Sequence, residues 1–131
     1  MKTNPANETL TIKRTRTGLG LFTVRSIERD HRIVEYTGAI ITNEEVKKSR
    51  SKYLMELDEC RTIDGSPRTN IARYINHSCR PNAAAYRSKG RMWIWSKRAI
   101  KAGEEITIDY GEDYLNAFIR TKGCRCQKCH S

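Results

Sequence analysis

The residues best suited to chemistry lie in residues 70–82, where an amide, an imidazole, a hydroxyl and a thiol follow one another from Asn76 to Cys79. Apolar residues such as Ile71 and Ile75 precede this run, as they would in buried chain. Polar groups carried into an interior must be hydrogen-bonded or must bind something. An isolated run of this kind is compatible with a satisfied core histidine before an Asn/Pro turn. Three further features, distant in the sequence, offer it partners and favour a functional site.

The first of these features is a cysteine-rich segment at residues 124–129, which carries three thiols. Tetrahedral zinc takes four soft ligands, and a Cys-x-x-Cys spacing is a common way to place two of them on one ion. The sequence therefore predicts one structural zinc ion, with Cys60 and His130 left open as substitutes for one ligand. The predicted ligands are Cys79, Cys124, Cys126 and Cys129.

The second feature is the glycine pair Gly18 and Gly20, which predicts a tight bend where the backbone can approach another group closely. The third is Tyr110, at the end of the predicted strand 105–109. Other tyrosines also lie beside turns or strand ends, and a ring of tyrosines can line a narrow channel for an alkylammonium group. These tyrosines are Tyr36, Tyr53, Tyr74 and Tyr114.

The elements that must position these residues are short strands separated by turns, a pattern that predicts an all-β, irregular architecture. A capping box formed by Thr42 and Glu45 predicts a short helix that ends near Ser49. Besides a first strand around Leu10 and Ile12, strands are predicted at residues 32–36, 39–41, 53–57, 61–64, 83–87, 91–96 and 105–109, with a hairpin joining 83–87 to 91–96.

In the predicted strand 91–96, Met92 and Ile94 share one face, and Trp93 and Trp95 share the other. Because both faces are apolar, the sequence predicts that this strand is buried on both sides.

Length and composition place limits on the class of protein. A chain of 131 residues with 37% apolar and 31% charged residues suits one soluble globular domain. No apolar run approaches the roughly 20 residues of a membrane span, and the N-terminus lacks a secretory signal, so we expect an intracellular protein. The net charge of +10 is compatible with a nucleic-acid partner, although a solvated basic surface is favoured. A homodimer and a monomer both remain open.

Five motifs occur in an order that resembles a SET-domain protein lysine methyltransferase, in the form of a minimal stand-alone domain with a post-SET zinc-binding tail. The resemblance covers about residues 9–130. The motifs are Gly18-x-Gly20, Tyr36-x-Gly38, Arg73-Tyr-Ile-Asn-His-Ser-Cys79-x-Pro-Asn82, Gly103-Glu-Glu-Ile-Thr-Ile-Asp-Tyr110-Gly111 and the terminal Cys-x-Cys-x-x-Cys.

The resemblance implies a mainly β SET fold, with several small sheets, short helices and a C-terminal pseudoknot. It implies a flexible tail at residues 1–8, a SET domain at 9–115 and a post-SET zinc-binding tail at 116–131. The tail departs from the family pattern, because only two residues separate Cys126 from Cys129 where many relatives have four.

The resemblance further implies that the chain uses S-adenosylmethionine to methylate a lysine, with Tyr110 as the catalytic residue. The implied cofactor-binding residues are Gly18, Leu19, Gly20, Tyr53, Arg73, Asn76, His77 and Tyr110. The implied lysine channel consists of Tyr53, Ile108, Tyr110 and Tyr114. Because relatives carry Phe or Tyr at position 108, Ile108 favours a di- or trimethylated product.

The implied substrate is a protein with a flexible lysine-containing tail, and a histone is favoured. This substrate places the protein in the nucleus, on chromatin, if it is eukaryotic or acts on host chromatin, and otherwise in the cytoplasm. Two alternatives stay open: a zinc-stabilised basic module that binds protein or nucleic acid without turnover, and a methyltransferase for a non-histone basic protein.

Overall fold

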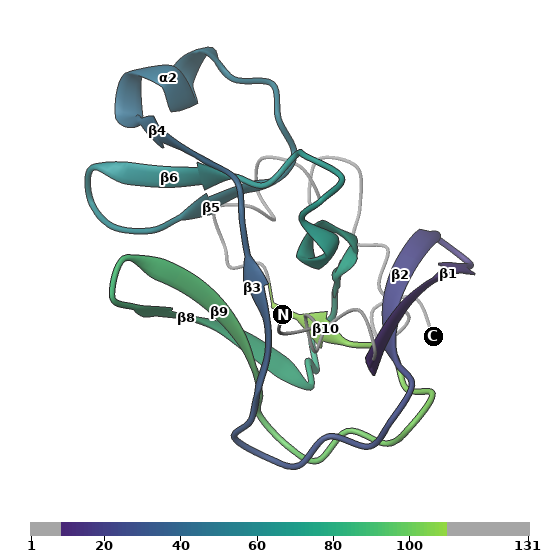
Figure 1. The fold of residues 1–131 in the computed structure, drawn as a ribbon. Coiled ribbons are helices and arrows are strands. Elements are labelled where there is room, and N and C mark those ends of the chain that lie inside the picture. Colours follow the sequence, from purple (N-terminus) through teal and green to yellow (C-terminus); the bar gives the residue numbers. More distant parts are fainter. Residues whose placement is uncertain (1–8, 110–131) are drawn as a thin grey trace, which may run out of the picture.

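The computed structural model describes residues 9–109, which form four small β-sheets and two short helices (Figure 1). This arrangement confirms the expected mainly β fold class. The predicted tails at 1–8 and 116–131 lie outside the described residues. Within the described range, no helix is both long enough and apolar enough to span a bilayer.

The elements are β1 (Leu10–Thr15), β2 (Gly18–Thr23), β3 (Arg32–Tyr36), β4 (Ala39–Thr42), α2 (Asn43–Lys48), β5 (Leu54–Glu56), β6 (Arg61–Asp64), η1 (Ile71–Tyr74), β7 (Asn76–His77), β8 (Ala83–Ser88), β9 (Arg91–Ser96) and β10 (Thr107–Ile108).

The central sheet has the order β3-β9-β8, and its β8–β9 hairpin confirms the hairpin predicted from the sequence. Ser88 pairs with Arg91, so that only Lys89 and Gly90 remain in the loop. Both loop residues have positive φ angles, 51° and 78°. Two-residue hairpin loops favour this left-handed geometry because its twist matches that of the flanking strands.

Strand β9 is buried on one face only, so the prediction of burial on both faces is wrong. Met92 and Ile94 are 4% and 0% exposed, whereas Trp93 and Trp95 on the opposite face are half-buried. The guanidinium of Arg32 covers this outer face, with its central carbon 4.0 Å from the Trp93 ring centroid and 5.3 Å from that of Trp95. A cation stacked on aromatic rings therefore takes the place of a second core layer.

A second sheet has the order β4-β6-β5 and carries the helix α2 at the end of β4. The Thr42 hydroxyl accepts a hydrogen bond from the Glu45 backbone N–H, and the Glu45 carboxylate accepts one from the Thr42 N–H. This reciprocal pair is the predicted capping box, and it confirms the start of the helix. The helix ends at Lys48, with Ser49 as its C-cap.

The chain passes directly from β3 to β4, although these two strands belong to different sheets. At the crossing, a Cβ on Gly38 would lie 1.9 Å from the Asp64 carbonyl oxygen, so only glycine allows this approach. The Tyr36 hydroxyl donates a hydrogen bond of 2.7 Å to the Tyr53 carbonyl oxygen. This bond ties the central sheet to the chain that leads into β5.

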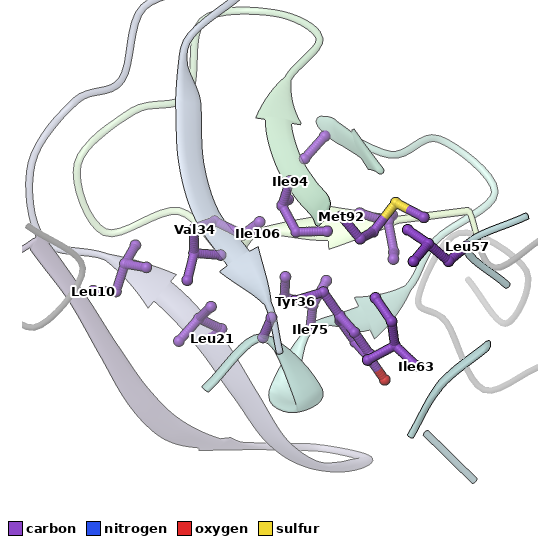
Figure 2. Packing of buried hydrophobic residues seen from close by; sticks show 13 residues of the cluster. Leu10, Leu21, Val34, Tyr36, Leu57, Ile63, Ile75, Met92, Ile94 and Ile106 are labelled. Carbon is purple, nitrogen blue, oxygen red and sulfur yellow. The ribbon is translucent and has the colours of Figure 1, made fainter. Parts of the chain in front are cut away.

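The hydrophobic core lies where the sheets meet, and Figure 2 shows side chains from separate elements pointing into one cluster. Leu21, Ile94 and Ile106 are completely inaccessible to solvent. Each such side chain contributes roughly 1.5–3 kcal/mol relative to an exposed position. The buried cluster comprises Leu10, Leu21, Val34, Tyr36, Leu57, Ile63, Ala72, Ile75, Ala83, Met92, Ile94, Ile106 and Ile108.

Strand β10 pairs in parallel with β7, so that Thr107 lies opposite Asn76 and Ile108 lies opposite His77. The strand predicted at 105–109 is therefore too long. Before β10 the chain pairs with β2 instead, through the Glu105–Phe22 bridge and a 2.8 Å bond from the Ile106 N–H to the Leu21 carbonyl. The further course of the expected pseudoknot lies outside the described residues.

The buried side chain of Asn82 holds this segment at the point where it changes partner. Its Nδ2 donates to the Glu105 carbonyl oxygen at 2.7 Å, and its Oδ1 accepts from the Thr107 N–H at 2.9 Å. Asn82 is 2% exposed. It therefore satisfies two backbone groups that the strand ladder leaves unpaired.

We predict that Asn82→Ala lowers the free energy of unfolding by about 2–4 kcal/mol, because two buried backbone groups lose their partners. Urea denaturation followed by circular dichroism measures this change. The matched control is Asn43→Ala, which removes an exposed hydrogen bond to the Glu59 carbonyl. We expect the control to cost less than about 0.5 kcal/mol. Equal losses for the two variants would contradict the role given to Asn82.

Candidate functional site

The glycine pair lies within strand β2, and the bend of the hairpin is formed by Arg16 and Thr17 just before it. The predicted position of the bend is therefore wrong by two residues. The expected close approach is found at Gly20, which is buried. A Cβ there would lie 2.5 Å from the Glu105 Oε2 and 3.1 Å from the Asn76 Nδ2. A larger side chain at position 20 would therefore displace a polar contact between two other segments.

The Asn76 side chain joins β7 to β2 and to the segment before β10. Its Nδ2 donates to the Leu19 carbonyl oxygen at 3.0 Å and to the Glu105 Oε2 at 2.8 Å. These two bonds use both hydrogens of the amide. No donor in residues 9–109 forms a hydrogen bond with the Asn76 Oδ1. The side chain therefore offers a fixed acceptor to a ligand.

His77 is buried beside Asn76, at 6% exposure. Its Nδ1 lies 3.8 Å from an Asp109 carboxylate oxygen, and its Nε2 lies 3.6 Å from the Cys79 sulfur. Burial lowers the pKa of His77, while the charge of Asp109 partly opposes that shift. The imidazole is therefore neutral at pH 7.

A pocket opens beside β10, and Arg73, Tyr53 and Ile108 all contribute to its wall. The Arg73 guanidinium lies over the Tyr53 ring at 4.3 Å and over the Tyr74 ring at 5.3 Å. The Arg73 Nε is buried and has no hydrogen-bond partner within the described part of the chain. The full lining consists of Tyr36, Lys52, Tyr53, Leu54, Met55, Ala72, Arg73, Ile75 and Ile108.

Within residues 9–109, most of the predicted site residues fall into two groups. Leu19 and Gly20 lie against the Asn76 amide, while Tyr53, Arg73 and Ile108 line the pocket. Gly18 begins β2 and makes no contact of this kind, since a Cβ there would meet nothing within 4 Å. Tyr110, Tyr114, Cys124, Cys126, Cys129 and His130 lie outside the described residues, and their predicted roles stay predictions.

Glu105 is a candidate-site residue that the sequence motifs did not single out. It stands in the Gly103-Glu-Glu motif, yet the motif alone does not say which carboxylate faces which group. The neighbouring Glu104 turns to a different set of partners and pairs with Arg98 at 2.7 Å. The alternation of side chains along a strand predicts that Glu104 and Glu105 point to opposite sides. It does not identify Asn76 as the partner of Glu105.

Two of the candidate zinc ligands are described, and both are exposed residues. Cys79 follows β7, whereas Cys60 lies in the turn between β5 and β6. In residues 9–109, no three His, Cys, Asp or Glu side chains are grouped as a metal site. Because three predicted ligands lie outside this range, the zinc site stays a prediction.

The small sheets packed around a parallel Asn-His strand form the type of site expected of a SET fold. Comparison with known sequences agrees, since the SET domain model matches residues 18–111. The chain therefore belongs to the SET-domain family.

Individual relatives are similar over most of the chain. Histone-lysine N-methyltransferase set-2 of Caenorhabditis elegans is 39% identical over 82% of this chain and 8% of its own length. A Schizosaccharomyces pombe enzyme named as specific for H3 lysine-4 is 38% identical over 70% of this chain and 11% of its own. A Candida glabrata enzyme named as specific for H3 lysine-36 is 37% identical over 86% of this chain and 18% of its own length. The chain thus spans less than a fifth of each relative.

Proposed function

We propose that the protein is an S-adenosylmethionine-dependent protein-lysine N-methyltransferase. The observation that carries this proposal is the meeting of Gly20, Asn76 and Glu105 at β7, while the paired strand β10 contributes Ile108 to a tyrosine-containing pocket. A methyl transfer between two molecules needs two adjoining sites, because alignment of donor and acceptor contributes much of the rate.

The residues present fit S-adenosylmethionine, which when bound supplies an electrophilic methyl group on a sulfonium. The Asn76 Oδ1 has an acceptor position for a ligand N–H or O–H, and the Glu105 carboxylate beside it favours a cationic group. The buried Arg73 Nε lacks an acceptor, which a ligand carboxylate would provide. Gly18, Leu19, Gly20, Tyr53, His77 and Tyr110 complete the proposed binding set.

The pocket residues would prepare the lysine for attack. A lysine amine has an ordinary pKa of about 10.4 and reacts only when neutral. The tyrosine rings and apolar side chains of the pocket wall disfavour the charged amine, and the cationic Lys52 and Arg73 of the same wall repel it. In this proposal Tyr53, Ile108, Tyr110 and Tyr114 line the channel, and the Tyr110 hydroxyl orients the amine nitrogen.

We propose a histone tail as the substrate, and hence a chromatin location. The names of the relatives support a histone. They include both H3 lysine-4 and H3 lysine-36 enzymes, so they favour neither lysine. The +10 charge of the chain also suits a partner rich in nucleic acid, such as a nucleosome.

We predict that Tyr110→Phe lowers kcat at least roughly 100-fold, because the amine loses the hydroxyl that orients it. Transfer of labelled methyl to a panel of purified histones measures this rate, and calorimetry measures cofactor binding. Tyr86→Phe is the control, because Tyr86 is 56% exposed on β8. A wild-type protein that binds the cofactor but labels no histone would overturn the histone assignment. Failure to bind the cofactor would overturn the proposed function.

The proposed product is di- or trimethyl-lysine, because Ile108 lines the pocket and offers no hydroxyl to hold a water against the amine. We predict that Ile108→Tyr shifts the product toward monomethyl-lysine. Mass spectrometry of a methylated peptide gives the distribution. Ile108→Val, which keeps a branched apolar side chain, should leave it unchanged. The same distribution in Ile108→Tyr and in the wild type would refute the assignment, provided that the melting temperature shows a folded variant.

A single zinc ion held by Cys79, Cys124, Cys126 and Cys129 is proposed for the post-SET tail, supported by the thiol spacing and by the exposed Cys79. We predict that Cys79→Ser lowers the zinc content of the purified protein, because one thiolate ligand is lost. Atomic emission gives the zinc-to-protein ratio. Cys60→Ser is the matched control and should keep the wild-type ratio. The reverse outcome would make Cys60 the ligand.

A further inference from the structure

We propose that Glu105 is a positioning residue, which acts through Asn76 to preset the S-adenosylmethionine site. The inference rests on the function proposed above and extends it to a residue that does not itself have to touch the cofactor. What carries it is the contact of one carboxylate oxygen with two motifs that are far apart in the sequence, at Gly20 and at Asn76.

The first step is the orientation of the amide. An asparagine side chain can turn by 180° and exchange its oxygen for its nitrogen, unless its partners distinguish the two. Both partners of the Asn76 Nδ2 are acceptors, namely the Glu105 Oε2 and the Leu19 carbonyl oxygen. The flipped orientation would set the Asn76 Oδ1 against these two acceptor oxygens. The carboxylate and the Leu19 carbonyl together therefore fix the orientation of the amide, and the carboxylate provides the shorter of the two bonds.

The second step is the position of the carboxylate itself. The Glu105 backbone bridges to Phe22, and its carbonyl oxygen accepts the Asn82 Nδ2 at 2.7 Å. Its side chain thus starts from a fixed point and passes over Gly20, where the missing Cβ leaves room for Oε2. The path of the Glu105 side chain explains why position 20 is a glycine, because a methyl group there would occupy the place of the carboxylate oxygen.

The third step concerns charge. In residues 9–109, no Lys, Arg or His lies within ion-pair distance of the Glu105 carboxylate, whereas the neighbouring Glu104 is paired with Arg98. Among these residues, the side-chain partner of the Glu105 carboxylate is the neutral Asn76 amide. Glu105 can affect the binding of a cationic ligand in two ways, and the experiment must separate them. One is the hydrogen bond from Asn76 to the carboxylate, and the other is the negative charge of the carboxylate.

The test uses the full chain and compares two conservative variants by calorimetric titration with S-adenosylhomocysteine and S-adenosylmethionine. Glu105→Gln keeps the length of the side chain and an oxygen that can accept from Asn76, but removes the charge. Glu105→Asp keeps the charge and shortens the reach by one methylene. We expect Gln to bind within about threefold of wild type and Asp to bind roughly tenfold more weakly, as for loss of one charge-assisted hydrogen bond.

Three controls make the outcome decisive. Glu28→Gln, at a carboxylate whose side chain is 86% exposed, should bind like wild type. Thermal melting confirms that each variant is folded. In an Asn76→Ala background, Glu105→Asp should cause no further loss of affinity, because its effect passes through Asn76.

Tight binding by Glu105→Asp together with weak binding by Glu105→Gln would overturn the inference and assign a purely electrostatic role. An undiminished loss in the Asn76→Ala background would overturn it as well. A wild-type protein that binds neither ligand would instead refute the proposed function, which keeps the two failures distinct.

Discussion

The carboxamide of Asn82 sets the position of the chain segment on which the site depends. Between Glu105 and Thr107 the segment stops pairing with β2 and begins to pair with β7. Backbone N–H and C=O groups at this change have no hydrogen-bond partner in a neighbouring strand. Asn82 satisfies one carbonyl and one N–H on either side of Ile106, which is completely buried. Buried backbone groups without partners are costly, so this one side chain makes a non-local crossing compatible with a dry core.

The crossing has a direct consequence for the site, because side chains alternate along extended chain. Glu105 turns toward Gly20 and Asn76, while Ile106 enters the core and Ile108 reaches the pocket. The polar contacts and the apolar pocket are therefore consequences of one short segment in a fixed register. A slip by one residue would exchange the two sets of side chains and remove both.

The charges at the site differ from those of the chain as a whole. The protein carries a net charge of +10, yet Glu105 and Asp109 bring carboxylates to Asn76 and His77. Burial keeps His77 neutral, and the Arg73 guanidinium is held against two tyrosine rings. This local arrangement would let a basic protein accept cationic groups, which its average charge would repel.

The sequence by itself determined the local elements and the family. The capping box at Thr42, the turn at Lys89 and Gly90, and the motif around Asn76 each depend on residues close together in the chain, and the sequence shows such patterns directly. Only the tertiary structure decided the half-burial of Trp93, the two-residue length of β10 and the partner of Glu105. Each of these depends on contacts between segments distant in sequence. Local propensity carries no information about which distant segment will supply a hydrogen bond or cover a face.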